Sequence, residues 1–477
     1  VTRNEDWRQC MAYTGTDQLA KATEGALTYN WDGAFIYDGI VYDHIHYRLR
    51  GANGRHQGTG KRSMKFKFNR GSHLAAKDQN GEPYARTWRV LTTAKMFGNR
   101  GEPSFGLVES LNPFLFRLVG VPAPMTHWYH FRLVDGEQEQ EDQHNGDFQG
   151  YFLAQERYDS RFLDQHNMKS GNIYKLADTV SDSLRLRRYL ADGAIADGTD
   201  HRLTRTDFAR KQTEEWLRNH ANMDIWYRWS AVKEAVRHYD WPSPSDKNMA
   251  WYFEPPFTVE NDFRGKLWLL PYDYDDTWGP AWNSGIETIK DGINKAGATE
   301  NADIKKEEKN FVRAFRDLIW QPDQLSLIIE SYHQIIKGID SANTDRWDGA
   351  PAAEGREAWG RKDLAYKAEN MMDYAFEGGN WSGGSVPNGG RAVYLDTYTR
   401  DADIPETPTL TYVGESGFPL DGLKFESSAF ADPDDANSFG AVEYRLAEIT
   451  PVGGGEQMFV EAGSTWSYLD DGSDQGS

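Results

Sequence analysis

Two segments near the N-terminus alternate between apolar and polar side chains, and this period of two predicts β-strands. Their inward faces are expected to carry Ile45, Tyr47 and Leu49 in the first segment and Met64, Phe66 and Phe68 in the second. Their outward faces carry His44, His46, Arg48 and Arg50, and then Lys65 and Lys67. Residues 51–60 between them are too rich in glycine for either a strand or a helix. The pattern therefore predicts a strand, a glycine-rich loop and a second strand, with basic side chains on one face.

The middle of the chain mixes helical and strand patterns. It predicts a helix over 104–119, strands over 126–134 and 150–155, a long helix over 213–238, strands over 250–253 and 266–272, and mainly helices over 306–376. In the long helix, Ile225, Trp229 and Val232 repeat at helical spacing, and the pattern stops before Pro242. We therefore expect an α+β fold in this part of the chain.

The character of the chain changes after residue 404. Short apolar segments separated by Gly, Pro and Asp turns predict strands of a small β-sandwich, namely LTYVG, LKFESSAF, VEYRLAEI and QMFVEAG. The sequence ends within this pattern, which leaves open an incomplete module. We expect an N-terminal extension (1–33), a main α+β domain (34–376), a Gly/Ser-rich connector (377–404) and the β module (405–477).

Composition narrows the classes of function. The formal net charge of −20 argues against a general nucleic-acid or anionic-membrane binder, because phosphate groups need Lys and Arg to replace their counterions. The single cysteine, Cys10, excludes a disulfide framework and a Cys-rich metal site. No apolar run approaches the roughly 18 residues that a membrane helix needs. The chain begins at Val1, so we expect it to be a mature or trimmed product.

An acidic cluster follows the apolar strand in LWLLPYDYDDTWG. The strand delivers Asp273 at its end, with Asp275 and Asp276 just behind it. Clustered carboxylates repel one another unless a cation holds them together, and their hard oxygen atoms suit Mg²⁺ or Mn²⁺. The alternative is a solvated turn with ordinary acidic residues.

A second polar segment, HYDWPSPSDKN, precedes that strand and holds Asp240, Asp246 and Asn248. Phosphoryl transfer uses a carboxylate to accept the hydroxyl proton, an Asn or Asp to hold metal, and another Asp to bridge metal and phosphates. The order here, a helix, a loop with Asp and Asn, two strands and then Asp273, matches that requirement. The alternative is a plain polar loop.

Further candidates lie in the first half of the chain. Lys65 or Lys67 could pair with phosphates beside the glycine loop, and Glu109 on the following helix is the expected partner of that lysine. Glu156, at the end of a predicted strand, could bind a nucleotide or brace the connector. The alternatives are a surface hairpin for the glycine loop and an exposed helix residue for Glu109.

These motifs, in this order, resemble the CotH kinase family, known first from spore-coat assembly. The resemblance rests on RLRG…KRSMKFKF, GDFQGYFLAQERYDSRFL, GNIYKL, DKNMAWYF and KLWLLPYDYDDTWGP with AWNSG, and it covers roughly 34–376. It implies an α+β, two-lobed protein-kinase-like fold. It also implies a metal-binding Asp273, a catalytic-loop Asp240 and a metal-holding Asn248. The spacing between Asp240 and Asn248 is longer than in ordinary kinases, so Asp246 remains an alternative base.

The resemblance implies transfer of phosphate from ATP, with Mg²⁺ or Mn²⁺, to Ser or Thr of a secreted or cell-surface protein. Phosphate contacts are expected from Arg48, Arg50, Lys61, Lys65 or Lys67, with Lys65 preferred. The same fold could instead transfer AMP or ligate glutamate. A different class also remains: a non-catalytic surface-binding, adhesion or carbohydrate-active protein, which the 13% aromatic content would suit. The DPDDAN segment (432–437) is a candidate Ca²⁺ site in the β module, but its spacing does not complete an EF-hand loop, and the alternative is a plain turn.

Overall fold

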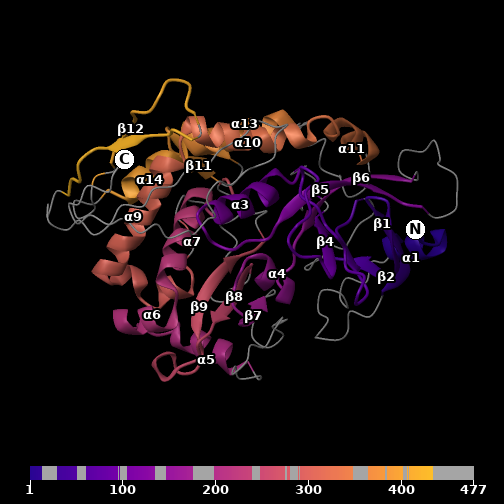
Figure 1. Ribbon diagram of the computed structural model, residues 1–477, viewed down its shortest axis with the longest axis horizontal. Helices are drawn as coiled ribbons and strands as arrows, with labels where there is room; N and C mark the ends of the chain where they lie inside the picture. Colours follow the sequence, from indigo (N-terminus) through magenta and orange to yellow (C-terminus); the bar gives the residue numbers. More distant parts are fainter. Residues whose placement is uncertain are drawn as a thin grey trace.

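The computed structural model shows an α+β protein (Figure 1). It describes residues 1–12, 30–50, 61–94, 96, 105–134, 147–175, 198–238, 248–273, 277–279, 288, 290–347, 364–381, 384–400, 406, 408–419 and 421–432. Within these residues, no helix is both long enough and apolar enough to cross a membrane.

The first half of the chain builds a six-stranded antiparallel sheet in the order β1-β2-β3-β4-β6-β5. Its strands are β1 (Trp31–Tyr37), β2 (Ile40–Leu49), β3 (Met64–Lys67), β4 (Val90–Ala94), β5 (Thr126–Arg132) and β6 (Phe148–Gln155). The predicted faces of β2 and β3 are confirmed, because Tyr47 and Phe66 are buried and paired while Arg48 lies opposite Lys65. Helix α1 (Asn4–Ala12) contacts β1 and β2, and Cys10 is buried there. The glycine-rich segment 51–60 lies outside the described residues.

The second half combines helices with a three-stranded antiparallel sheet, β7-β8-β9. Its strands are β7 (Asn172–Lys175), β8 (Met249–Glu254) and β9 (Lys266–Pro271). The main helices are α3 (Leu107–Leu118), α6 (Glu214–His220), α7 (Met223–Val236), α9 (Ala302–Leu318), α10 (Pro322–Ile336) and α13 (Leu364–Met372). Helix α7 is central: it contacts α3, α9 and β9, and its Trp226 and Trp229 are almost completely buried.

The prediction of one long helix over 213–238 is wrong, because the structure has two helices, α6 and α7, in that range. Between them, Ala221 forms a parallel bridge with Leu267 of β9. The backbone N–H of Asn222 donates to the Leu267 oxygen at 2.9 Å, and its side chain accepts from Ile225 N–H at 3.3 Å as the N-cap of α7. Pairing with a strand and capping a new helix both require non-helical backbone at this point.

Shorter elements complete the described chain. They are α4 (Ser160–Gln165), α5 (Thr199–Asp207), α8 (Gly292–Lys295), α11 (Asp340–Trp347), α14 (Gly390–Tyr398), the 3₁₀ turns Val259–Asn261 and Ala298–Glu300, the π-helical turn Asp373–Glu377, and the strands β10 (Gly379–Trp381), β11 (Gly384–Val386), β12 (Leu410–Tyr412) and β13 (Phe425–Ser427). Strands β12 and β13 lie within LTYVG and LKFESSAF, two of the segments predicted as strands, and they form an antiparallel pair. The two later segments of the predicted sandwich, and 433–437 of the candidate Ca²⁺ site, lie outside the described residues.

Helix α11 joins the helical half to the six-stranded sheet, where it lies beside β6 (Figure 1). The Asn343 side-chain oxygen accepts from the Tyr151 N–H at 3.3 Å. The Trp347 indole donates to the Gln149 oxygen at 3.1 Å, and the Arg346 guanidinium donates to the Phe148 oxygen at 2.5 Å. Gly150 is needed at this contact, because a Cβ there would lie 2.3 Å from the Asn343 oxygen.

Candidate functional site

Asn248 and Asp273 come together at one end of the β8–β9 pair. Met249 of β8 is paired with Pro271 of β9, so the residue before β8 and the residues after β9 leave the sheet side by side. Asn248 and Asp273 have φ angles of +62° and +61°, a left-handed conformation that Asn and Asp adopt more readily than most residues. Asn248 is buried and Asp273 is partly exposed. Asn248 and Asp273 therefore lie at the same end of the strand pair, and their binding of one shared cation stays a prediction.

His238 fixes the backbone at Asp273. It lies two residues beyond the end of α7, is almost completely buried, and its Nε2 lies 2.6 Å from the Asp273 backbone oxygen. A carbonyl only accepts, so the imidazole must carry its proton on Nε2 and donate it. The left-handed Arg237 (φ +47°) ends α7 and turns the chain so that His238 can make this contact. Sequence reasoning missed His238, although its place at the end of a helix and two residues before Asp240 was a usable signal.

The segment after the acidic cluster is anchored by Asn112 of α3, which is fully buried. Its amide donates to the Thr277 hydroxyl and its oxygen accepts from the Trp278 indole, both at 2.8 Å. The Trp278 N–H donates to the Val236 oxygen at 2.9 Å, and its ring stacks on Trp320 at a centroid distance of 4.9 Å. The chain is thus held on both sides of residues 274–276.

Arg50 connects the six-stranded sheet to the end of β9. Its Nη2 donates to the Tyr272 hydroxyl at 2.7 Å, and its Nη1 donates to the backbone oxygen of Thr93 on β4 at 3.3 Å. Tyr272 is the residue immediately before Asp273, and its ring also lies against Tyr158 at a centroid distance of 6.0 Å. Residues 222 positions apart in the sequence therefore meet beside the candidate site.

Lys61, another of the basic residues expected to contact phosphate, has different surroundings from Arg50. Lys61 is buried: its ammonium donates to the Tyr151 oxygen and, at 2.6 Å, to the Asn343 side chain, and it lies 4.5 Å from the centre of the Phe152 ring. Burial holds the pKa of Lys61 well below its usual range. These contacts join β6 to α11, so the geometry favours a structural role for Lys61 over contact with phosphate.

Lys65 and Lys67 remain on β3 as predicted. Lys65 is partly exposed and lies between Arg48 on β2 and Thr92 on β4, whereas Lys67 is exposed opposite His46. Glu109 is buried in the first turn of α3, which is not the exposed helix position given as the alternative. Pairing of Lys65 with Glu109 stays a prediction.

Glu156 braces the connection after β6. Its carboxylate accepts from the Met125 N–H at 3.1 Å and lies 3.0 Å from the Nε2 of His166. Its own N–H donates to the Met125 oxygen at 2.8 Å. Nucleotide binding and bracing of the connector were both left open for this buried residue, and the observed contacts are those of a brace.

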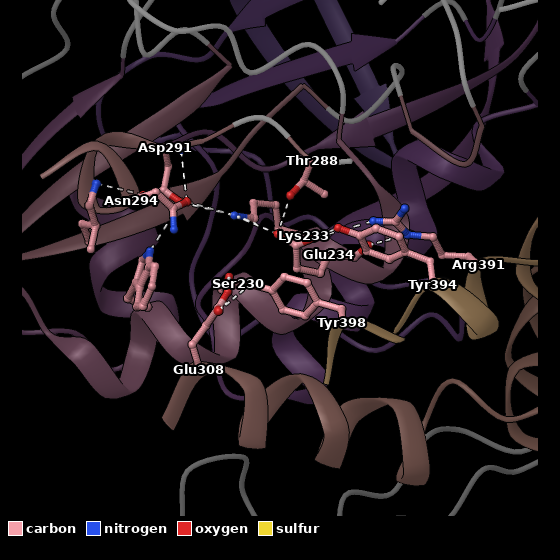
Figure 2. A network of polar contacts seen from close by, with 12 residues as sticks. Ser230, Lys233, Glu234, Thr288, Asp291, Asn294, Glu308, Arg391, Tyr394 and Tyr398 are labelled. Atoms are coloured by element: carbon pink, nitrogen blue, oxygen red, sulfur yellow. Dashed lines mark hydrogen bonds and ion pairs between the residues drawn. The ribbon is translucent and has the colours of Figure 1, made fainter. Parts of the chain in front are cut away.

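A buried polar network links α7 to α9, α14, Thr288 and residues 291–294. Figure 2 shows its side chains pointing toward one another from these elements. The Lys233 ammonium lies 3.2 Å from Glu234 and 3.3 Å from Asp291. Burial disfavours its charged form, but these carboxylates outweigh that effect and raise the pKa of Lys233. The guanidinium of Arg391 donates through Nε to the Glu234 backbone oxygen at 2.8 Å.

Glu308 of α9 is the third carboxyl group of this network. The hydroxyls of Ser230 and Tyr398 lie 2.5 and 2.6 Å from its two oxygens (Figure 2). Burial, followed by the nearby Glu234 carboxylate, raises the pKa of Glu308. The Thr288 hydroxyl also binds Glu234. The network therefore ties the chain that follows the acidic cluster to the helix that leads into His238.

Oxygen donors for a hard cation are present at the site. Asn248 and Asp273 supply an amide oxygen and a carboxylate, which suit Mg²⁺ or Mn²⁺. Asp240, Asp246 and Asp275 lie outside the described residues. Within the described ranges, no group of three or more His, Cys, Asp or Glu is placed to hold a metal ion. A complete ligand set would have to include residues beyond Asn248 and Asp273.

The family comparison covers most of this architecture. The model of the family described as CotH kinase protein matches residues 54–352, well over half of the chain. The chain belongs to the CotH kinase family. The match runs from before β3 to just after α11, so it includes His238, Asn248 and Asp273. Membership in the CotH kinase family indicates a kinase-like phosphotransferase. A search of the curated proteins gives no match.

Proposed function

We propose that this protein is an ATP- and divalent-metal-dependent kinase that phosphorylates Ser or Thr of secreted or cell-surface proteins. The observation that carries the proposal is the meeting of Asn248 and Asp273 at the β8–β9 end, with His238 fixing the Asp273 backbone. We further propose a two-lobed, kinase-like arrangement, with the six-stranded sheet as the first lobe and the helical half as the second, followed by a β-sandwich module.

Each residue has a role in this proposal. Asp273, Asn248 and Asp275 hold Mg²⁺ or Mn²⁺, and Asp240 or Asp246 accepts the proton of the acceptor hydroxyl. Lys65, oriented by Glu109, contacts the phosphates. The metal ion, when bound, neutralises negative charge on the phosphates. Membership in a kinase family and the hard oxygen donors at the strand ends support these assignments.

The first experiment follows transfer of the labelled γ-phosphate of ATP to casein as the acceptor, with Mn²⁺ or Mg²⁺. We expect Asp273→Asn to lower transfer by about a hundredfold or more, as for loss of a group that acts mainly in the transition state. Asp224→Asn is the matched control, because Asp224 is an exposed carboxylate on α7 that pairs with Arg228. Equal transfer by Asp273→Asn and the wild type would remove Asp273 from the mechanism.

Further measurements on the same purified protein distinguish phosphate transfer from the alternative functions. Label appearing in the acceptor from α-labelled ATP means transfer of AMP, and a mass increase without either label means transfer of glutamate. A binding or adhesion role predicts no rise in Tm with ATP and Mn²⁺, whereas a nucleotide site predicts a rise that grows with ligand concentration. A rise in Tm with an oligosaccharide alone would favour a carbohydrate-active protein.

A further inference from the structure

The backbone around Asp273 is held from two directions. On its C-terminal side, the Asp273 carbonyl accepts from His238, which belongs to the helical half. On its N-terminal side, Tyr272 is bound through its hydroxyl by Arg50, which comes from the six-stranded sheet. The position of Asp273 therefore depends on both halves of the protein.

Arg50 is fixed to the six-stranded sheet, so its contact with Tyr272 depends on where that sheet lies. Its backbone N–H donates to the Ser63 oxygen at 2.8 Å, just before β3. Its guanidinium also binds the Thr93 oxygen on β4 at 3.3 Å. A planar guanidinium held at two of its nitrogens has little rotational freedom, so its contact with Tyr272 is directional.

We infer that Tyr272 is a positioning residue, through which Arg50 of the six-stranded sheet sets the place of Asp273 for the metal–nucleotide complex. The inference rests on the proposed function of Asp273. Tyr272 need not touch the nucleotide itself: its hydroxyl takes the hydrogen bond from Arg50, and its main chain passes directly into Asp273. A small displacement of a metal ligand is costly for catalysis, because reacting groups must be placed within a fraction of an ångström.

The hydrogen bond from the charged Arg50 should contribute more to the positioning by Tyr272 than the packing of the Tyr272 ring does. Hydrogen bonds to charged groups are among the stronger ones in proteins. Tyr272→Phe removes the hydroxyl and leaves the ring in place against Tyr158. We expect the KM for Mn²⁺–ATP to rise about tenfold, the effect of losing one such bond, with Tm almost unchanged.

A double-mutant cycle provides the decisive test. We expect Tyr272→Phe to raise the KM for Mn²⁺–ATP in the wild type but to add little in the Arg50→Met background, because that background has already lost the Arg50–Tyr272 bond, together with the bond to the Thr93 oxygen. Arg50→Lys keeps a cation without the planar fork and should restore only part of the wild-type value. Tyr252→Phe is the matched control, since its hydroxyl binds the Lys169 oxygen at 2.7 Å in the same three-stranded sheet. It should leave KM unchanged.

Two results would overturn the inference. One is an unchanged KM in Tyr272→Phe while the wild type turns over Mn²⁺–ATP. The other is independent, multiplying effects of the two single changes, which would mean that Arg50 acts on the nucleotide without Tyr272. Absence of turnover and of Mn²⁺–ATP binding in the wild type is a separate outcome, which contradicts the proposed function and with it the inference that depends on it.

Discussion

The imidazole Nε2 of His238 lies 2.6 Å from the backbone oxygen of Asp273. His238 is buried at the end of α7, and Asp273 has left-handed backbone at the end of β9. Left-handed backbone costs free energy in a residue other than glycine, although less in Asp than in most, and surrounding contacts help to retain it. We therefore regard His238 as one of the contacts that keep Asp273 in this conformation.

We predict that His238→Ala lowers turnover of ATP by about tenfold, the effect of losing one hydrogen bond that orients the site. Steady-state kinetics with Mn²⁺ measures the effect. His333→Ala is the control, because His333 pairs with Glu330 on its own helix, α10. Unaltered kinetics in His238→Ala would mean that other contacts suffice to place Asp273.

Asn112 should matter mainly for stability. Asn112→Ala deletes two buried hydrogen bonds and leaves the Thr277 hydroxyl and the Trp278 indole without this partner. We expect a loss of about 2–4 kcal/mol in the free energy of unfolding. Urea denaturation measures it, and Asn69→Ala, which removes contacts of an exposed side chain to backbone oxygens, is the comparison. Equal losses in the two variants would contradict the importance given to Asn112.

Lys61→Met and Lys65→Met should have different effects on the kinetics with ATP. Lys61→Met keeps the length of a buried side chain whose ammonium contacts β6 and α11, so we expect the KM for ATP to change less than about twofold. Lys65→Met should raise that KM or lower kcat by about tenfold or more, as for loss of a phosphate-binding cation. Steady-state kinetics of the two variants, measured side by side, tests which change has the larger effect. A larger effect of Lys61→Met would make Lys61 the phosphate contact.

Glu308 should make stability depend on pH. The pKa of this carboxyl is raised above its ordinary value of 4.5 in the folded protein, so the folded state binds its proton more tightly than the unfolded chain does. Its contribution is therefore complete below about pH 4.5 and is lost as pH rises through the folded pKa. Glu308→Gln should flatten the decline of stability over this range. Thermal unfolding between pH 4 and pH 8 measures it, and identical profiles of variant and wild type would refute the assignment.

Local patterns predicted much of the fold. Alternation along β2 and β3 identified their buried faces, because the period of a strand is visible in a few residues. The break between α6 and α7 was missed because it depends on pairing of Ala221 with Leu267, which no local pattern contains. The helix predicted over 104–119 is present as α3, which spans Leu107–Leu118, and Gly120 follows it with φ +83°.

The candidate site was predictable only in part. The order of motifs was enough to expect Asn248 and Asp273 together, since both flank neighbouring strands. The contact of Arg50 with Tyr272 joins residues far apart in sequence and was not foreseen. Lys61 was read as a phosphate candidate because it is basic and follows a glycine-rich segment, but its burial depends on Asn343 of a helix much later in the chain.

The docking of α11 on β6 also has a consequence for motion. Three hydrogen bonds, from Tyr151, Arg346 and Trp347, join this helix to the strand. If the six-stranded sheet shifts relative to the helical half, α11 should travel with the sheet. The flexing would then fall on the short turn around Gly338, between α10 and α11, where a Cβ would meet no atom within 4 Å. That turn is where we expect the pivot of any opening movement.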